Sequence, residues 1–121
     1  MQHNDLRILC VEDDHDVGHI VRLALALDTA MEIRIVADEA GALSAVAGGF
    51  DPDVLLLNDG TRTDLPARMG VACGIEPPPV IFLTTDVRVS NLTRLKAAAA
   101  GVIAKPFDPL NLAATVRSLI G

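Results

Sequence analysis

The pattern of apolar and polar residues divides the chain into short apolar runs and longer amphipathic segments. Residues 8–11, 54–57 and 80–83 are continuous apolar runs, which are typical of strands covered on both faces. In residues 31–37 apolar and charged side chains alternate, which favours a strand at the edge of a sheet. A last short strand is predicted over residues 102–104.

Apolar residues recur at helical spacing in the segments that follow these strands. Asp38 is expected to cap the second helix, and Gly101 to end the fourth. Asp108 and Pro109 form a start signal for the last helix, because aspartate caps helices and proline suits their first position. The predicted helices run from Val17 to Leu27, from Asp38 to Gly48, through a short segment at 65–73, from about Arg88 to Ala100, and from Asp108 to Ile120.

Five strands therefore alternate with five helices in a chain of 121 residues. Right-handed crossovers between consecutive strands give a parallel sheet with helices on both faces, which is the doubly wound α/β class. The length fits one domain over residues 1–121, with no separate effector domain. In such sheets ligands bind outside the carboxyl ends of the strands, so the chemistry is expected there.

Composition narrows the classes of function. The chain has 10 basic and 16 acidic residues, a formal net charge of −6, which argues against binding to nucleic acid. Half of the residues are hydrophobic, yet the longest apolar stretch, 97–104, is about half a membrane span. With no secretory leader pattern at the start, these features predict a folded cytoplasmic protein that does not enter membranes.

Neither the cysteines nor the histidines form a recognisable metal or redox motif. Cys10 and Cys73 lack the spacing of a metal-binding pair and are expected to be small buried residues. His15 and His19 lie one turn apart on the first predicted helix and are expected at the surface. The candidate chemistry must therefore come from other side chains.

Polar residues follow four of the predicted strands. They are the acids at 12–14, Asn-Asp-Gly at 58–60, Thr-Thr-Asp at 84–86, and Lys105. Carboxylates gathered at one strand end suit Mg²⁺, although the acids at 12–14 taken alone are explained equally well as helix caps. A hydroxyl and an ammonium group opposite would hold the oxygens of a phosphoryl group. Because the chain has eight arginines and two lysines, Lys105 supplies a compact charge where a planar one is the commoner choice.

These segments resemble the receiver domain of two-component response regulators. The resemblance rests on ILCVEDD at 8–14, PDVLLL at 52–57, PVIFLT at 79–84 and KPF at 105–107, and it covers nearly the whole chain. It implies a flavodoxin-like, CheY-like sheet with strand order 2-1-3-4-5. It also implies a signalling module rather than an enzyme. Its partners would be a sensor histidine kinase or phosphotransfer protein and a downstream protein.

The resemblance assigns roles to the residues at the strand ends. Thr84 corresponds to the switch hydroxyl, and Lys105 to the lysine that binds phosphate. The output or dimer surface would comprise the fourth helix, fifth strand and fifth helix, within residues 80–121, which hold 2 acids and 5 bases. The ligands of Mg²⁺ would be Glu12, Asp13, Asn58 and the backbone of Gly60.

The sequence departs from the family pattern at the phosphate-accepting position, which is Asn58. A carboxamide lacks the anionic oxygen that attacks phosphorus, so no acyl phosphate is expected there, and Mg²⁺ binding should be weakened. We expect Lys105 to face two acids without requiring metal. Val102 stands where many receivers have a Tyr or Phe that changes rotamer, and residues 60–66 lack the family's usual loop sequence. The sequence fits both a natural loss of the acceptor and an engineered exchange.

Alternative readings remain open. The neighbouring Asp59 could accept phosphate if a bulge or an early strand end brought it into place. The segment at 58–61 is similar to the motif of haloacid-dehalogenase-type phosphatases, but their nucleophile would then fall on the apolar Leu57. The preferred hypothesis is a single-domain receiver that acts by protein contact, either within a phosphorelay or independently of phosphorylation, as a monomer or weak homodimer.

Overall fold

The computed structural model describes residues 5–61 and 64–121 and confirms the alternation of strands and helices. The strands are β1 (Leu6–Val11), β2 (Met31–Val36), β3 (Val54–Asn58), β4 (Val80–Thr84) and β5 (Gly101–Ala104). The helices are α1 (His15–Ala26), α2 (Glu39–Ala47), α3 (Leu65–Cys73), α4 (Val89–Ala97) and α5 (Leu112–Ile120).

All five strands are parallel and form one sheet in the order β2-β1-β3-β4-β5. The predicted sheet order is therefore confirmed, and so is the placement of the alternating strand β2 at an edge. In the register of the sheet, Val11 lies opposite both Val36 and Leu57, while Thr84 lies opposite Ala104. The carboxyl ends of the central strands thus meet along one edge, where the polar residues follow.

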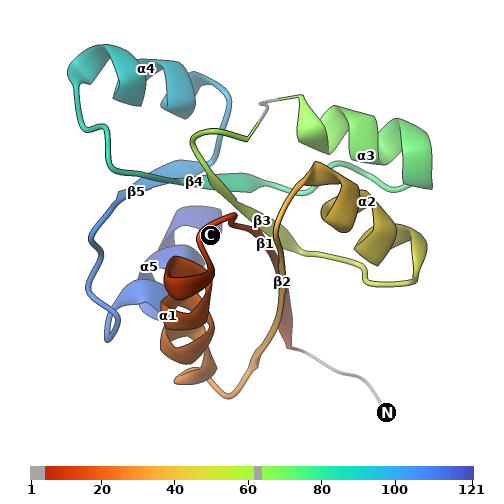
Figure 1. Ribbon diagram of the computed structural model, residues 1–121, viewed down its shortest axis with the longest axis horizontal. Coiled ribbons are helices and arrows are strands. Elements are labelled where there is room, and N and C mark those ends of the chain that lie inside the picture. Colours follow the sequence, from red (N-terminus) through yellow and green to blue (C-terminus); the bar gives the residue numbers. More distant parts are fainter. Residues whose placement is uncertain (1–4, 62–63) are drawn as a thin grey trace.

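The helices cover the two faces of the sheet unequally, as Figure 1 shows. The helices α1 and α5 pack on one face, where Val21, Leu25 and Val116 join the apolar side chains of the strands. The helices α2, α3 and α4 cover the other face through residues such as Met69 and Leu95. Because both faces are buried, the central strands consist of continuous apolar runs rather than alternating ones.

Three helix boundaries differ from the prediction. The helix α1 begins at His15, two residues before the predicted Val17. Asp108 does not cap α5; its carboxylate accepts hydrogen bonds from the Leu110 N–H and the Asn111 side chain, so a turn precedes the helix. Gly101 does not end α4, which stops at Ala97, but begins β5. A Cβ at Gly101 would lie 2.7 Å from the methyl carbons of Leu119, so the missing side chain lets α5 approach the strand.

Helix caps place the start of α1 and α2 beside the carboxyl ends of the strands. Asp14 accepts hydrogen bonds from the backbone N–H groups of Asp16 and Val17, and Asp38 accepts one from Gly41, as predicted. Asp14 thus caps α1, while the side chains of Glu12 and Asp13 do not take part in the cap and belong to the site described below. No helix within the described residues is long and apolar enough to cross a membrane.

Candidate functional site

Side chains from four strand ends meet at the carboxyl edge of the sheet. Lys105, after β5, places its Nζ 2.9 Å from Oε1 of Glu12, after β1. Asn58, the last residue of β3, donates from Nδ2 to Oε2 of the same carboxylate at 3.3 Å. The structure therefore brings together Glu12, Asn58 and Lys105 as the sequence predicts, across 93 positions of chain.

The ion pair between Glu12 and Lys105 lies largely out of solvent. The side chain of Glu12 is 2% exposed and that of Lys105 is 16% exposed. A carboxylate buried to this degree requires partners for both oxygens, because an unpaired buried charge is costly. Its second oxygen accepts from Asn58 and, at 3.1 Å, from the backbone N–H of Asp14.

Asn58 connects the two acids that the resemblance assigns to Mg²⁺. Its Nδ2 donates to Oδ1 of Asp13 at 3.1 Å as well as to Glu12. Its carbonyl oxygen points the other way and accepts a hydrogen bond of 2.7 Å from the hydroxyl of Thr61. The carboxamide therefore donates N–H groups to both acids. The prediction that Lys105 faces two acids is corrected: Lys105 pairs with Glu12, while Asn58 bonds to both Glu12 and Asp13.

This arrangement does not fit the usual magnesium site. Mg²⁺ needs oxygen ligands, but Asn58 turns its nitrogen toward Glu12 and Asp13 and engages its oxygen with Thr61. A cation would have to displace that nitrogen and turn the amide. Within residues 5–61 and 64–121, no three His, Cys, Asp or Glu side chains are placed to hold a metal ion.

Asp59 lies on the other side of the site, next to β4. The strand β3 ends at Asn58, and the chain turns there, because the backbone N–H of Thr61 donates to the backbone carbonyl of Asn58 at 3.1 Å. The Asp59 carboxylate accepts a hydrogen bond from the hydroxyl of Thr84. An early strand end, rather than a bulge, thus brings Asp59 to the Thr84 hydroxyl.

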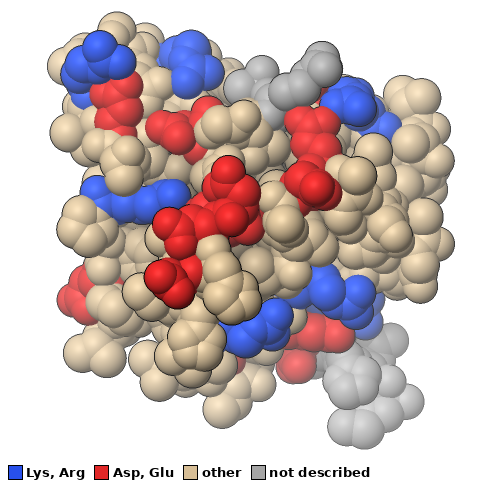
Figure 2. Space-filling view, viewed as in Figure 1, with Lys and Arg blue, Asp and Glu red and all other residues tan. Residues whose placement is uncertain are grey.

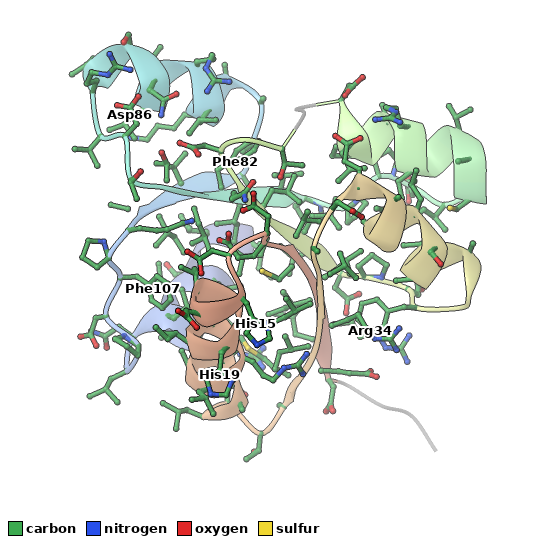
Figure 3. The ribbon with its side chains drawn as sticks, in the orientation of Figure 1. His15, His19, Arg34, Phe82, Asp86 and Phe107 are labelled. Atoms are coloured by element: carbon green, nitrogen blue, oxygen red, sulfur yellow. The ribbon has the colours of Figure 1, made fainter. Side chains whose placement is uncertain are left out.

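Thr84 is completely buried and has polar partners on every side. Besides donating to Asp59, its oxygen accepts from the backbone N–H of Asp86 at 2.9 Å and from Nδ2 of Asn91 at 3.4 Å. Asn91 belongs to the first turn of α4, and Asp86 lies at the foot of that helix (Figure 3). The hydroxyl therefore links β3 and β4 to α4.

Comparison with solved structures identifies the architecture. The chain matches the chemotaxis response regulator CheY4 of Vibrio cholerae with a TM-score of 0.75 at 24% identity, over 95% of this chain and 98% of that one. A response regulator from Thermotoga maritima matches with a TM-score of 0.78 at 19% identity, over 96% and 98% of the two chains. The signal receiver domain of a putative Luxo repressor protein from Vibrio parahaemolyticus matches with a TM-score of 0.77 at 19% identity, over 96% and 90%.

This chain has the CheY-like receiver fold. No protein-family model matches it, and no curated protein matches it significantly. Below 25% identity the likeness is one of fold, so the roles of individual residues must be argued from the site itself. That site differs from the pattern implied by the resemblance at Asn58, whose carboxamide donates to the acids.

Val102 and Gly60, to which the resemblance assigned roles, lie in β5 and beside the site. Val102 is half-buried in β5 and packs on the face covered by α2, α3 and α4. Gly60 lies beside the carboxamide, where a Cβ would be 3.7 Å from Oδ1 of Asn58. The peptide bond between Lys105 and Pro106 is cis.

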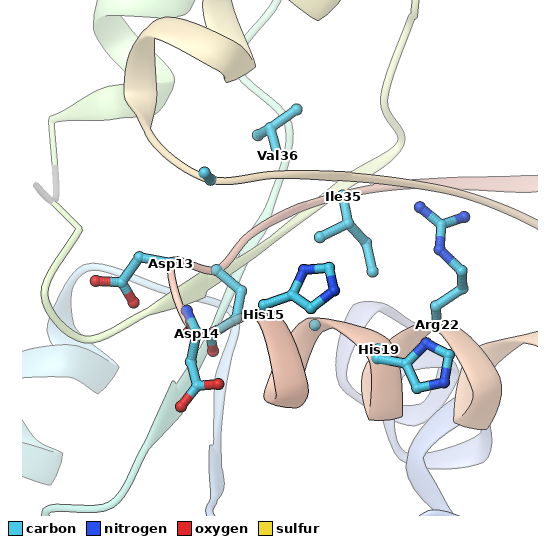
Figure 4. A pocket seen from close by; sticks show the side chains of 10 residues that line it. Asp13, Asp14, His15, His19, Arg22, Ile35 and Val36 are labelled. Carbon is cyan, nitrogen blue, oxygen red and sulfur yellow. Dashed lines mark hydrogen bonds between the residues drawn. The ribbon is translucent and has the colours of Figure 1, made fainter.

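Two hollows open on either side of Asp13. One, of about 300 Å³, lies between α1 and β2 and is lined by Gly18, Arg22 and the exposed residues His15 and His19 (Figure 4). The other, of about 270 Å³, opens toward α2 and is lined by Asn58, Gly60 and Thr61 among others. Acidic side chains gather near the middle of the face in Figure 2, with basic side chains around them.

Cys10 lies in the core beneath the site and is chemically quiet. Burial raises the pKa of its thiol to about 12, and the charge of Glu12 acts in the same direction. It is therefore a packing residue, as predicted, whereas Cys73 is only half-buried.

The sequence analysis missed two residues of the site. Thr61 follows Asn58 by three positions, a spacing that a turn brings into contact, so the signal was present in the sequence. Asn91 carried no such signal, because its contact with Thr84 depends on how α4 packs against β4.

Proposed function

We propose that this chain is a receiver module of two-component signalling that acts by contact with other proteins and is not phosphorylated, because Asn58 stands at the acceptor position. The observation that carries the proposal is the orientation of the Asn58 carboxamide, which donates to Glu12 and Asp13 while its oxygen is bonded to Thr61. The receiver fold and the convergence of Glu12, Thr84 and Lys105 at the strand ends support the assignment to this class.

The chemistry of the side chain at position 58 supports the proposal that the chain is not phosphorylated. An acyl phosphate forms when an anionic carboxylate oxygen attacks phosphorus. Asn58 has no anionic oxygen, and the amide nitrogen that faces the acids is a donor without a nucleophilic lone pair. The cation that would approach a phosphoryl group, Lys105, is paired with Glu12. The module then has one stable arrangement of its site.

The partners we propose are a sensor histidine kinase or phosphotransfer protein and a downstream protein. Exposed apolar residues at and before the starts of α4 and α5 support a protein partner: Val89, the first residue of α4, is 80% exposed. Val87, before α4, is 57% exposed, and Leu110, before α5, is 80% exposed. Arg94 and Lys96 add positive charge to the last turn of α4. Apolar side chains surrounded by charges are typical of protein contacts.

A phosphatase is the less favoured alternative. The residue in the position of the nucleophile would be Leu57, which is apolar and completely buried in the sheet. No oxygen or sulfur nucleophile is therefore offered there. Sustained release of phosphate from a generic phosphomonoester would revive this class, and the proposal expects none.

The proposed function is tested by incubating the chain with a small acyl-phosphate donor and Mg²⁺, followed by intact mass spectrometry. The unaltered chain should gain no phosphoryl group, and Asn58→Asp should gain one. Asp59→Ala, alone and combined with Asn58→Asp, is the matched control. An adduct on the unaltered chain that disappears in Asp59→Ala would overturn the proposal and make Asp59 the acceptor, a candidate favoured by its bond to Thr84.

A further inference from the structure

The hydrogen-bonding capacity of the Thr84 hydroxyl is used up by the protein itself. A hydroxyl has one proton to donate and two lone pairs to accept with. The proton is donated to Asp59, the nearer of two acceptors, the other being the Asp86 carbonyl at 3.4 Å, and the oxygen accepts from the Asp86 N–H and from Asn91. Because Thr84 is completely buried, water cannot supply alternative partners. An added anion could bind this hydroxyl only by displacing Asp59.

The same bonds continue into α4. The side chain of Asn91 donates to the carbonyl of Asp86 at 2.9 Å, and its oxygen accepts from Arg94 at 2.7 Å. Asp86 is also fixed by Arg88, which bonds to the carboxylate through its backbone and side chain. The segment between β4 and α4 is therefore tied at one end to the Thr84 hydroxyl, and through it to Asp59.

We propose that the Asp59 carboxylate accepts the hydrogen bond of the Thr84 hydroxyl in place of a phosphoryl oxygen. Through this bond Asp59 holds the start of α4 in one arrangement without phosphorylation. The inference rests on the proposed function, in which Asn58 accepts no phosphate. Asp59 and Asn91 are then positioning residues for the surface that carries Val87 and Val89.

Two features of the backbone make Asp59 suited to this role. In a strand, successive side chains point to opposite faces of the sheet. Since β3 stops at Asn58, the side chain of Asp59 is free of this constraint and turns toward β4. The two neighbouring side chains thus divide the site, with Asn58 serving the acids and Asp59 serving the hydroxyl. A carboxylate is the strongest acceptor that a side chain offers to a hydroxyl.

The proposal is tested by amide hydrogen exchange on the full chain without any phosphate donor. Thr84→Val removes the acceptor of the Asp86 N–H and should speed its exchange by about tenfold, the factor expected from one lost hydrogen bond. Asp59→Ala should speed the same exchange by a smaller factor, because it frees the hydroxyl that accepts from this N–H. The double variant should exchange no faster than Thr84→Val alone, because Asp59 reaches the Asp86 N–H only through the Thr84 hydroxyl. Asp59→Asn keeps an acceptor oxygen and should stay closer to the parent than Asp59→Ala.

Asp53→Ala is the matched control, since this carboxylate accepts from the Arg7 N–H at the opposite edge of the sheet. It should speed exchange at Arg7 and leave Asp86 unchanged. Unaltered protection of the β1 amides shows in each variant that the fold is retained.

The proposal is overturned if Asp59→Ala leaves exchange at Asp86 unchanged, or if the effects of Asp59→Ala and Thr84→Val simply add. Either result would leave the proposed function standing, because that function is judged by the mass of the phosphoryl adduct. Conversely, an adduct on Asp59 would end the proposed function whatever the exchange rates show.

Discussion

The two halves of the site satisfy buried polar groups by opposite means. On the side of β1 and β5, the buried carboxylate of Glu12 is held by a cation and by amide donors. On the side of β4 and α4, the buried hydroxyl of Thr84 is held by a carboxylate and by neutral donors. The first half depends on an ion pair, and the second on hydrogen bonds.

The carboxamide of Asn58 satisfies the two acids beside it without an added ion. A third carboxylate at position 58 would repel Glu12 and Asp13, whereas the carboxamide donates to both. The next residue, Asp59, keeps an anion in the site but places it against the hydroxyl. Neither half then needs an added ion to satisfy its buried groups.

The largest expected effect comes from removing the cation of the first half. Lys105→Met should lower the free energy of unfolding by about 3 kcal/mol, because it leaves a buried carboxylate without its counter-charge. Urea denaturation measures the loss. The control is Arg7→Met, whose partner Glu32 is half-exposed, and which should change stability little. Equal losses of stability at both positions would show that burial does not set the contribution of the Glu12–Lys105 ion pair to the free energy of unfolding.

Introducing a carboxylate at position 58 should also destabilise the protein when no metal is added. Asn58→Asp removes the donors to Glu12 and Asp13 and adds a like charge, at a cost of about 2 kcal/mol. Thermal unfolding with and without Mg²⁺ measures this loss and its recovery. A variant as stable as the parent in the absence of Mg²⁺ would contradict the view that the carboxamide satisfies the two acids.

In the second half the effect should be smaller, because no charge pair is broken. Thr84→Val keeps the shape of the side chain but leaves the Asp86 N–H without its acceptor, which should cost about 1 kcal/mol. Thr84→Ser keeps the hydroxyl and serves as the control in the same urea series. If Thr84→Val lowers the free energy of unfolding as much as Lys105→Met, the ion pair does not distinguish the first half of the site from the second.

The smallest expected effect is a shift in titration at the foot of α4. Hydrogen bonds from Arg88 lower the pKa of Asp86 to about 2. Arg88→Ala should raise it toward the ordinary value of 3.8, as followed by NMR of the carboxyl carbon. Because the folded pKa is lowered, this pair stabilises the fold above pH 3.8 and loses its effect as the pH falls toward 2. A pKa of Asp86 that does not move in Arg88→Ala would rule out the ion pair as its cause.

Much of the fold could be predicted because its signals are local. The continuous apolar run at 54–57 becomes a strand buried on both faces, and the alternating run at 31–37 becomes the edge strand β2. The convergence of Glu12, Asn58 and Lys105 followed from the rule that parallel strands end at one edge. These features depend on spacing and chain direction alone.

Other features depend on contacts that spacing does not determine. Asp108 has the sequence of a helix cap, yet its carboxylate is taken by Leu110 and Asn111, which delays α5. The contact of Asp59 with Thr84 depends on the exact residue at which β3 ends, and that of Asn91 on the packing of α4. The orientation of the Asn58 amide is fixed by Thr61, a partner outside the matched motif.

The most direct test of the central claim is a calorimetric titration of Mg²⁺ into the chain and into Asn58→Asp. The account holds that the Asn58 carboxamide already satisfies Glu12 and Asp13, so Mg²⁺ should bind the Asn58→Asp variant at least about tenfold more tightly, as expected when an anionic oxygen ligand replaces a donor. Equal affinity in the two proteins would contradict it.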